Sequence, residues 1–108
     1  MDLAQKKCVA CEGGVALLNR VEAEVLMKQL KGWTLSGDGQ WLSKDFSFKD
    51  FKGALSFADK VGKLAEAEGH HPDLQVRWGK TVVELTTHAI GGLSENDFIL
   101  AAKIDEIS

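Results

Sequence analysis

Apolar side chains recur with the 3.6-residue period of an amphipathic helix in two long segments of the chain. The first segment begins at Asn19, which forms the pattern of a capping box with Glu22, and it should end at Gly32. The second segment covers residues 49–68 and is followed by Gly69, a residue type that is favoured just after a helix. The predicted buried stripe of this second helix consists of Phe51, Ala54, Leu55, Ala58, Val61, Leu64 and Ala65.

Alternation of apolar and polar residues predicts two β-hairpins between the helices. Residues 33–48 alternate on both sides of the sequence GDGQ, whose residue types tolerate positive φ in a turn. Residues 74–87 alternate around Gly79-Lys80, with the glycine first, as in a type II′ turn. A last helix should begin near Ser94, because Ser94 and Asp97 have the pattern of a second capping box. The order α-β-β-α-β-β-α predicts an α+β fold, a four-stranded antiparallel sheet with the helices packed on one face.

The register of the second hairpin determines which of its residues share a face. With Gly79-Lys80 as the turn, alternation groups one apolar set, namely Leu74, Val76, Trp78, Thr81, Val83 and Leu85. Trp78 is therefore expected to pack in the core rather than to stack on a ligand. Counted outward, the same register places position 71 opposite position 88. Pro72 lacks an N–H and weakens the last pairs, so the prediction is one of proximity between these positions.

Composition and charge narrow the class of protein. The 108 residues suffice for one domain, which we place at residues 18–108, after an irregular arm at residues 1–17. With 44% apolar residues and a net charge of −3, the chain has an ordinary soluble balance and no basic field that would attract nucleic acid or an anionic membrane. The apolar runs are too short to cross a bilayer, and we expect a cytoplasmic protein.

Cys8 and Cys11 are spaced as a C-x-x-C pair within the arm. This spacing is typical of half a zinc site or of a redox pair. The chain contains no second cysteine pair to complete a four-cysteine site, and no helical pattern follows closely to activate a thiol. A local or dispensable role is therefore favoured over metal binding or redox chemistry.

The three histidines of the chain are the main candidates for chemistry. His70 and His71 adjoin Pro72 in the loop after the second helix, and the hairpin register brings His88 toward them. Imidazole titrates near neutrality when it is unperturbed, so converging imidazoles can supply an acid and a base together. Separate surface histidines are an equally weighted alternative. A zinc site is less favoured, because adjacent histidines project in different directions.

Two carboxylates near the histidines have both a structural and a functional interpretation. Asp97 completes the cap of the last helix, which is its favoured role, and the short connection from His88 to Ser94 also keeps it close to the histidines. Glu66 lies one turn before His70. It is either a solvated helix carboxylate, which the sequence favours, or a group that orients an imidazole.

The same residues carry a resemblance to a known family. The stretch GHHPDLQVRW, followed by a histidine and an aspartate at fixed spacing, and the stretch THAIGGLSENDF resemble the signature of the pterin-4a-carbinolamine dehydratases. The resemblance covers about residues 18–107, and the predicted order of helices and strands is also that of this family. The signature positions filled here are Glu66, His70, His71, Pro72, Trp78, His88 and Asp97.

The resemblance implies a hydro-lyase that dehydrates 4a-hydroxytetrahydropterin to quinonoid dihydropterin and so recycles tetrahydropterin cofactor. It implies no metal and no organic cofactor. It assigns acid–base chemistry at the 4a-hydroxyl to His70 and His88, whereas His71 would mainly bind and orient the pterin. Backbone groups near Thr86 and Thr87 would meet the edge of the pterin as an added strand does. The binding and orienting positions are then Glu66, Pro72, Trp78, Thr86, Thr87 and Asp97.

Two other functions stay open beside the dehydratase. Animal relatives also serve as dimerisation cofactors for a homeodomain transcription factor, so one alternative is a non-catalytic pterin-binding or regulatory module. The other is a related enzyme of molybdopterin metabolism. The three histidines favour catalysis, since a scaffold would not need them.

The resemblance also bears on partners. It implies a homodimer or homotetramer, associated through sheet edges and helices, and an aromatic amino-acid hydroxylase as a pathway partner. Leu74 and Asn96 stand where animal members have a tryptophan and an arginine, which leaves the contacts at the pocket rim and the identity of the pterin open.

Overall fold

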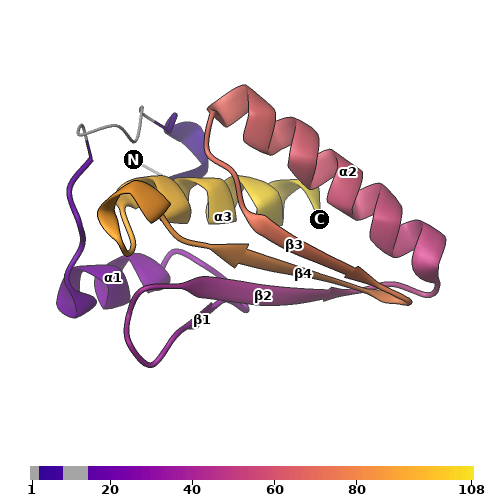
Figure 1. The fold of residues 1–108 in the computed structure, drawn as a ribbon, viewed down its shortest axis with the longest axis horizontal. Helices are drawn as coiled ribbons and strands as arrows, with labels where there is room; N and C mark the ends of the chain where they lie inside the picture. The colour runs from indigo at the N-terminus through magenta and orange to yellow at the C-terminus, as the bar shows by residue number, and fades with distance from the viewer. Residues whose placement is uncertain (1–2, 9–14) are drawn as a thin grey trace.

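The computed structural model describes residues 3–8 and 15–108, and its helices and strands follow the predicted order α-β-β-α-β-β-α (Figure 1). Short 3-10 helices precede α1 and α3. The elements in chain order are η1 (Leu3–Gln5), α1 (Arg20–Met27), β1 (Thr34–Leu35), β2 (Leu42–Ser47), α2 (Phe51–Glu68), β3 (Asp73–Arg77), β4 (Lys80–Leu85), η2 (His88–Ile90) and α3 (Glu95–Ile107). The predicted α+β class is confirmed.

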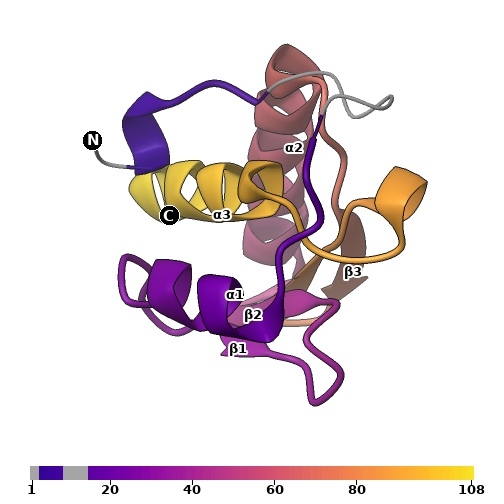
Figure 2. The same cartoon turned by 90° about the vertical axis from the view of Figure 1, so that its left-hand side faces the viewer.

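The four strands form one antiparallel sheet in the order β1-β2-β4-β3, with β1 and β3 at the edges. Alternation along β4 buries Thr81, Val83 and Leu85, whereas the residues between them are partly exposed. The hydroxyl Oγ1 of Thr81 donates to the Ala54 carbonyl of α2 at 2.6 Å, which ties this helix to the buried face. The two views show α2 and α3 on the same side of the sheet (Figure 2), as predicted.

Helix α1 begins as predicted but ends early. Asn19 is its N-cap and forms the expected capping box with Glu22. The helix ends at Met27, so the prediction that it continues to Gly32 is wrong. The reason is that the N–H groups of residues 28–30 donate to the carbonyls three residues before them, which tightens the chain into turns instead of extending the helix.

Helix α2 ends at Gly69 as predicted, and Gly69 adopts the left-handed conformation with φ +68°. The predicted buried stripe is partly wrong, because Phe51 and Leu55 are 46% and 51% exposed. Phe57 is buried instead and packs against Phe46 of β2, with ring centroids 4.6 Å apart. The residues of α2 that are buried are Ala54, Phe57, Ala58, Val61 and Ala65.

The hairpin of β3 and β4 is shifted by two residues from the predicted register. Arg77 pairs with Lys80, so the turn is Trp78-Gly79, and the glycine occupies its second position with φ +75°. The predicted type II′ turn at Gly79-Lys80 is therefore wrong. A shift of two keeps every side chain on its predicted face, but it moves Trp78 into the turn. There it is 74% exposed, and the prediction that it packs in the core is wrong.

The register shift also changes the neighbours of the histidines. Asp73 pairs with Glu84, so two further steps outward bring position 71 level with position 86, not with position 88. Within residues 3–8 and 15–108, no helix is both long enough and apolar enough to cross a membrane.

Candidate active site

The end of α2 and the start of α3 bring His70 and Asp97 together inside the molecule. His70 follows Gly69, and its Nε2 atom lies 2.6 Å from Oδ1 of Asp97. His70 is 4% exposed and Asp97 is completely buried. An ionised carboxylate only accepts hydrogen bonds, so His70 donates through Nε2. This bond fixes both the orientation and the tautomer of the imidazole.

The second oxygen of Asp97 is bound by the start of α3 and the end of the sheet. Oδ2 accepts from the Ser94 backbone N–H at 3.0 Å and from the Thr87 hydroxyl at 2.8 Å. The Thr87 hydroxyl has one proton and donates it to Asp97. In the 2.8 Å contact between the hydroxyls of Ser94 and Thr87, Ser94 Oγ is therefore the donor. Asp97 thus completes the predicted capping box and binds a histidine as well. These donors compensate the burial of its charge.

His71 lies on the surface beside His70 and has a different carboxylate partner. Its Nε2 atom contacts Oε2 of Glu66 on the last turn of α2. The side chains of His71 and Glu66 are 62% and 75% exposed. Glu66 therefore orients His71 rather than His70, and it does so in solvent.

His88 begins the short helix η2 and contacts an aromatic residue that the sequence analysis missed. Its ring meets the ring of Trp41 edge to face, with centroids 5.7 Å apart and planes at 76°. Trp41 directly precedes Leu42, which pairs with Leu85, so Trp41 is level with Thr86 at the end of β4. The proximity of Trp41 to His88 can be inferred only once the pairing of β2 with β4 is known.

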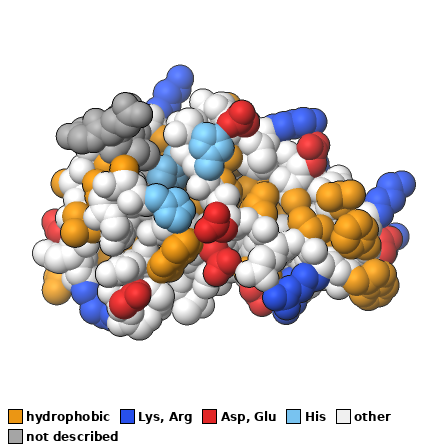
Figure 3. Space-filling view, viewed as in Figure 1, with side chains coloured by type: hydrophobic (Ala, Val, Ile, Leu, Met, Phe, Trp, Pro, Cys, Tyr) orange, Lys and Arg blue, Asp and Glu red, His pale blue; other side chains and the backbone are white. Residues whose placement is uncertain are grey.

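The three histidines line one cavity of about 240 Å³. The histidine side chains gather on one face of the molecule (Figure 3). Two helix ends and the end of β4 supply the walls, so the structure brings together all three histidines and both threonines named from the sequence. The lining residues are Gly69, His70, His71, Thr86, Thr87, His88 and Ala89.

The two threonines of the cavity are held by the surrounding loops. The Thr86 hydroxyl donates to the Gln40 carbonyl at 2.7 Å. The Thr87 N–H donates to the Gly92 carbonyl at 2.8 Å, so this N–H already has a partner within the chain. The expectation that backbone groups near Thr86 and Thr87 meet a pterin stays a prediction.

Four of the predicted binding and orienting positions are not among the residues that line the cavity, namely Glu66, Pro72, Trp78 and Asp97. Pro72 connects His71 to β3, and it follows the end of α2 at Glu68. Trp78 lies in the turn at the far end of β3, and the structure does not bring it to the histidines of its own chain.

No group of three or more His, Cys, Asp or Glu side chains is arranged to hold a metal ion in the part of the chain that the structure describes. Cys8 lies near the start of α3, with its Sγ atom 3.6 Å from the Asn96 carbonyl oxygen. Cys11 lies outside the described residues, so the expectation for the C-x-x-C pair stays a prediction.

Residues 16–107 match the family described as pterin 4 alpha carbinolamine dehydratase. A protein of Nitrosomonas eutropha is 51% identical over 105 residues, which cover 96% of this chain and 91% of its relative. A protein of Methylococcus capsulatus is 49% identical over 106 residues, which cover 98% of this chain and 93% of its relative. Both carry the name "Putative pterin-4-alpha-carbinolamine dehydratase".

A solved structure has the same fold. It is the crystal structure of a protein from Brucella melitensis that is described as a transcriptional coactivator/pterin dehydratase. It is 29% identical to this chain with a TM-score of 0.79, and the match covers 85% of this chain and 98% of that one. The chain therefore belongs to the pterin-4-alpha-carbinolamine dehydratase family, a family of hydro-lyases.

Proposed function

We propose that this chain dehydrates 4a-hydroxytetrahydropterin to quinonoid dihydropterin and water, and so recycles tetrahydropterin cofactor. The observation that carries the proposal is the cavity in which His70, His71 and His88 meet, with His70 held by the buried carboxylate of Asp97. Membership of the family supplies the substrate class.

The reaction needs what these side chains can supply. Loss of the hydroxyl from C4a requires a proton for the leaving oxygen, and formation of the quinonoid product requires loss of a proton from the ring. His70 and His88 perform these two transfers. They approach the cavity from different elements and differ in exposure, since His70 is buried and His88 is exposed. Each positioned transfer is worth roughly 10²- to 10⁴-fold in rate.

The exposed pair of His71 and Glu66 binds substrate rather than transferring protons. His71 binds and orients the pterin at the open side of the cavity, and Glu66 fixes the direction of its imidazole. Asp97 fixes His70 in the same way from within the core.

The size of the cavity favours recognition of the pterin ring rather than of its side chain. Its volume of about 240 Å³ is below the roughly 300 Å³ at which pockets for larger ligands begin. A small bicyclic ring suits such a space, and a substituent on the ring would extend into solvent. The enzyme would then accept tetrahydropterins that differ in this substituent.

The Brucella relative is described as a coactivator as well as a dehydratase. A module that only mediates dimerisation does not need a buried histidine whose tautomer is fixed by a carboxylate. The His70–Asp97 pair therefore favours catalysis for this chain.

Stopped-flow decay of 4a-hydroxytetrahydropterin tests the proposal. Wild type should accelerate the decay, and His70→Ala and His88→Ala should each lose most of that acceleration while they remain folded by circular dichroism. Glu24→Gln is the control, because Glu24 is an exposed carboxylate of α1 that pairs with Arg20 in solvent. A folded wild type without acceleration would contradict the dehydratase.

We also propose that a second copy of the chain covers the exposed face of α2. Phe51 and Leu55 lie on that face and are about half exposed, and apolar surface of this kind marks interaction sites. The homodimer or homotetramer implied by the family resemblance would bury it. Sedimentation equilibrium at micromolar concentration should give an oligomer for wild type and a smaller species for Leu55→Glu. A monomeric wild type would contradict this part of the proposal.

A further inference from the structure

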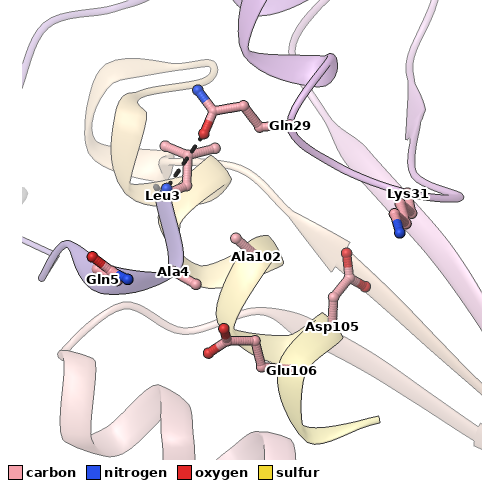
Figure 4. Close-up of a pocket in the computed structure, with 8 residues that line it drawn as sticks. All are labelled: Leu3, Ala4, Gln5, Gln29, Lys31, Ala102, Asp105 and Glu106. Carbon is pink, nitrogen blue, oxygen red and sulfur yellow. Dashed lines mark hydrogen bonds between the residues drawn. The ribbon is translucent and has the colours of Figure 1, made fainter. Parts of the chain in front are cut away.

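Residues 3–8 form a segment, here called the N-terminal strap, that lies along α3. Leu3 is 2% exposed and belongs to the hydrophobic core. Its N–H donates to Oε1 of Gln29, after α1, at 3.3 Å. Figure 4 shows η1 beside Ala102 of α3, on one side of a cavity of about 590 Å³. The first end of the strap is therefore anchored by burial as well as by a hydrogen bond.

The other end of the strap contacts both helices that carry the His70–Asp97 pair. The Cys8 N–H donates to Oε1 of Glu68, the last residue of α2, at 3.0 Å. The Cys8 thiol lies 3.6 Å from the carbonyl oxygen of Asn96, in the first turn of α3. Lys6 forms an ion pair of 2.9 Å with Glu95, the first residue of α3. The strap thus bridges the end of one helix and the start of the other.

Glu68 is the centre of this bridge. One carboxylate oxygen accepts from the Cys8 N–H, and the other lies 3.6 Å from Nζ of Lys103 on α3. The side chains of Glu68 and Lys103 are only 12% and 17% exposed. Glu68 therefore joins α2 to α3 directly and also through the strap.

These contacts are adjacent in sequence to the site pair. Glu68 is two residues before His70, and Asn96 is next to Asp97. The residue between Glu68 and His70 is Gly69, which has no side chain that would restrain its backbone. Hydrogen bonds weaken steeply with distance and angle, so a small movement of either helix end would break the 2.6 Å contact.

We propose that Glu68 is a positioning residue, and that through it the N-terminal strap holds His70 against Asp97. Its consequence for catalysis rests on the proposed dehydratase function. Its consequence for the imidazole does not depend on that function, because the hydrogen bond of His70 and Asp97 joins two side chains of the protein itself. A misplaced catalytic group lowers the rate of the chemical step more than it weakens binding of substrate, so the effect should fall on kcat.

Variants of the full chain test the proposal. Glu68→Ala removes the bridge, and Leu3→Ala weakens the buried anchor at the other end of the strap. Glu68→Gln keeps an acceptor for the Cys8 N–H and should rescue part of the loss. Glu24→Gln removes an exposed carboxylate from α1 and serves as the control.

The first readout is the imidazole N–H proton of His70 in ¹⁵N-labelled protein, assigned by its loss in His70→Ala. Its exchange with solvent should speed up by roughly tenfold or more in Glu68→Ala and Leu3→Ala, and should stay slow in Glu24→Gln. The second readout is dehydratase kinetics. We expect kcat to fall roughly 10- to 100-fold in the two strap variants, with KM within about twofold of wild type.

The outcomes separate this proposal from the proposed function. Unchanged exchange of the His70 proton in both strap variants overturns the positioning role, even if their melting temperatures fall. Faster exchange supports the positioning role whether or not the wild type is a dehydratase. Faster exchange with an unchanged kcat would overturn the link from the strap to catalysis.

Discussion

Nε2 of His70 lies 2.6 Å from Oδ1 of Asp97, although the two residues are 27 positions apart in the chain. Each stands at a helix end, His70 just after the glycine that terminates α2 and Asp97 in the first turn of α3. The geometry of the pair is therefore set by where two helices stop and start. A C-terminal glycine and a capping box normally only delimit helices, and here they also place this histidine and this carboxylate side by side.

Asp97→Asn should impair both catalysis and stability. An amide keeps the shape of the carboxylate but carries one acceptor oxygen, so it cannot accept from His70 and from the Thr87 and Ser94 donors together. We expect kcat to fall roughly 10²-fold and the free energy of unfolding in urea to fall by about 1–3 kcal/mol. Glu106→Gln, on the exposed end of the same helix, is the control. A kcat close to that of wild type would exclude Asp97 from the site.

Glu66→Gln should change substrate binding and leave stability almost unaltered. The Glu66–His71 pair is largely solvated, and exposed ion pairs contribute only about 0–1 kcal/mol. If Glu66 orients His71 toward the pterin, KM should rise severalfold while kcat stays near that of wild type. A double-mutant cycle with His71→Ala measures the coupling. Strictly additive effects on KM would show that the two residues act separately.

The elements that the sequence predicts well are those with local signals. Asn19, Gly69 and Ser94 each delimit a helix through contacts with residues a few positions away, and all three were placed correctly. The face of the sheet on which each side chain of β3 and β4 lies was also predictable, because a register shift of two residues leaves every side chain on the same face. The position of the turn between β3 and β4 was not predictable, because a glycine such as Gly79 suits either position of a two-residue loop.

The remaining errors concern contacts between elements far apart in the chain. Phe57 rather than Leu55 enters the core because Phe46 and Phe48 face it from the β2 side, which helical period alone cannot reveal. Trp41 was missed for the same reason, since it reaches His88 only through the pairing of β2 with β4. The sequence grouped the histidines but could not show that Asp97 binds His70 and Glu66 binds His71.

The loop between β1 and β2 should make a pH-dependent contribution to stability. The pKa of Asp38 lies below its ordinary value of 3.8, because the Ser36 hydroxyl and then the Gln40 N–H donate to its carboxylate. A lowered folded-state pKa stabilises the fold above pH 3.8, and this contribution is lost as the pH falls through the lower folded-state value. The difference in unfolding free energy between wild type and Asp38→Asn should therefore narrow below pH 3.8. A constant difference down to about pH 2 would contradict this assignment.

Asp105→Ala should destabilise the protein without affecting its chemistry. Asp105 accepts hydrogen bonds from the buried indole N–H of Trp33 at 3.0 Å and from Nζ of Lys44 at 2.7 Å, at the end of α3 away from Asp97. Its removal leaves a buried donor without an acceptor, so the free energy of unfolding should fall by about 1–3 kcal/mol. Asp105→Asn keeps an acceptor oxygen for Trp33 and should lose less. The kcat of both folded variants should match wild type, because this network and the His70–Asp97 pair share no residue. A fall in kcat as large as that of Asp97→Asn would show instead that the two ends of α3 are coupled.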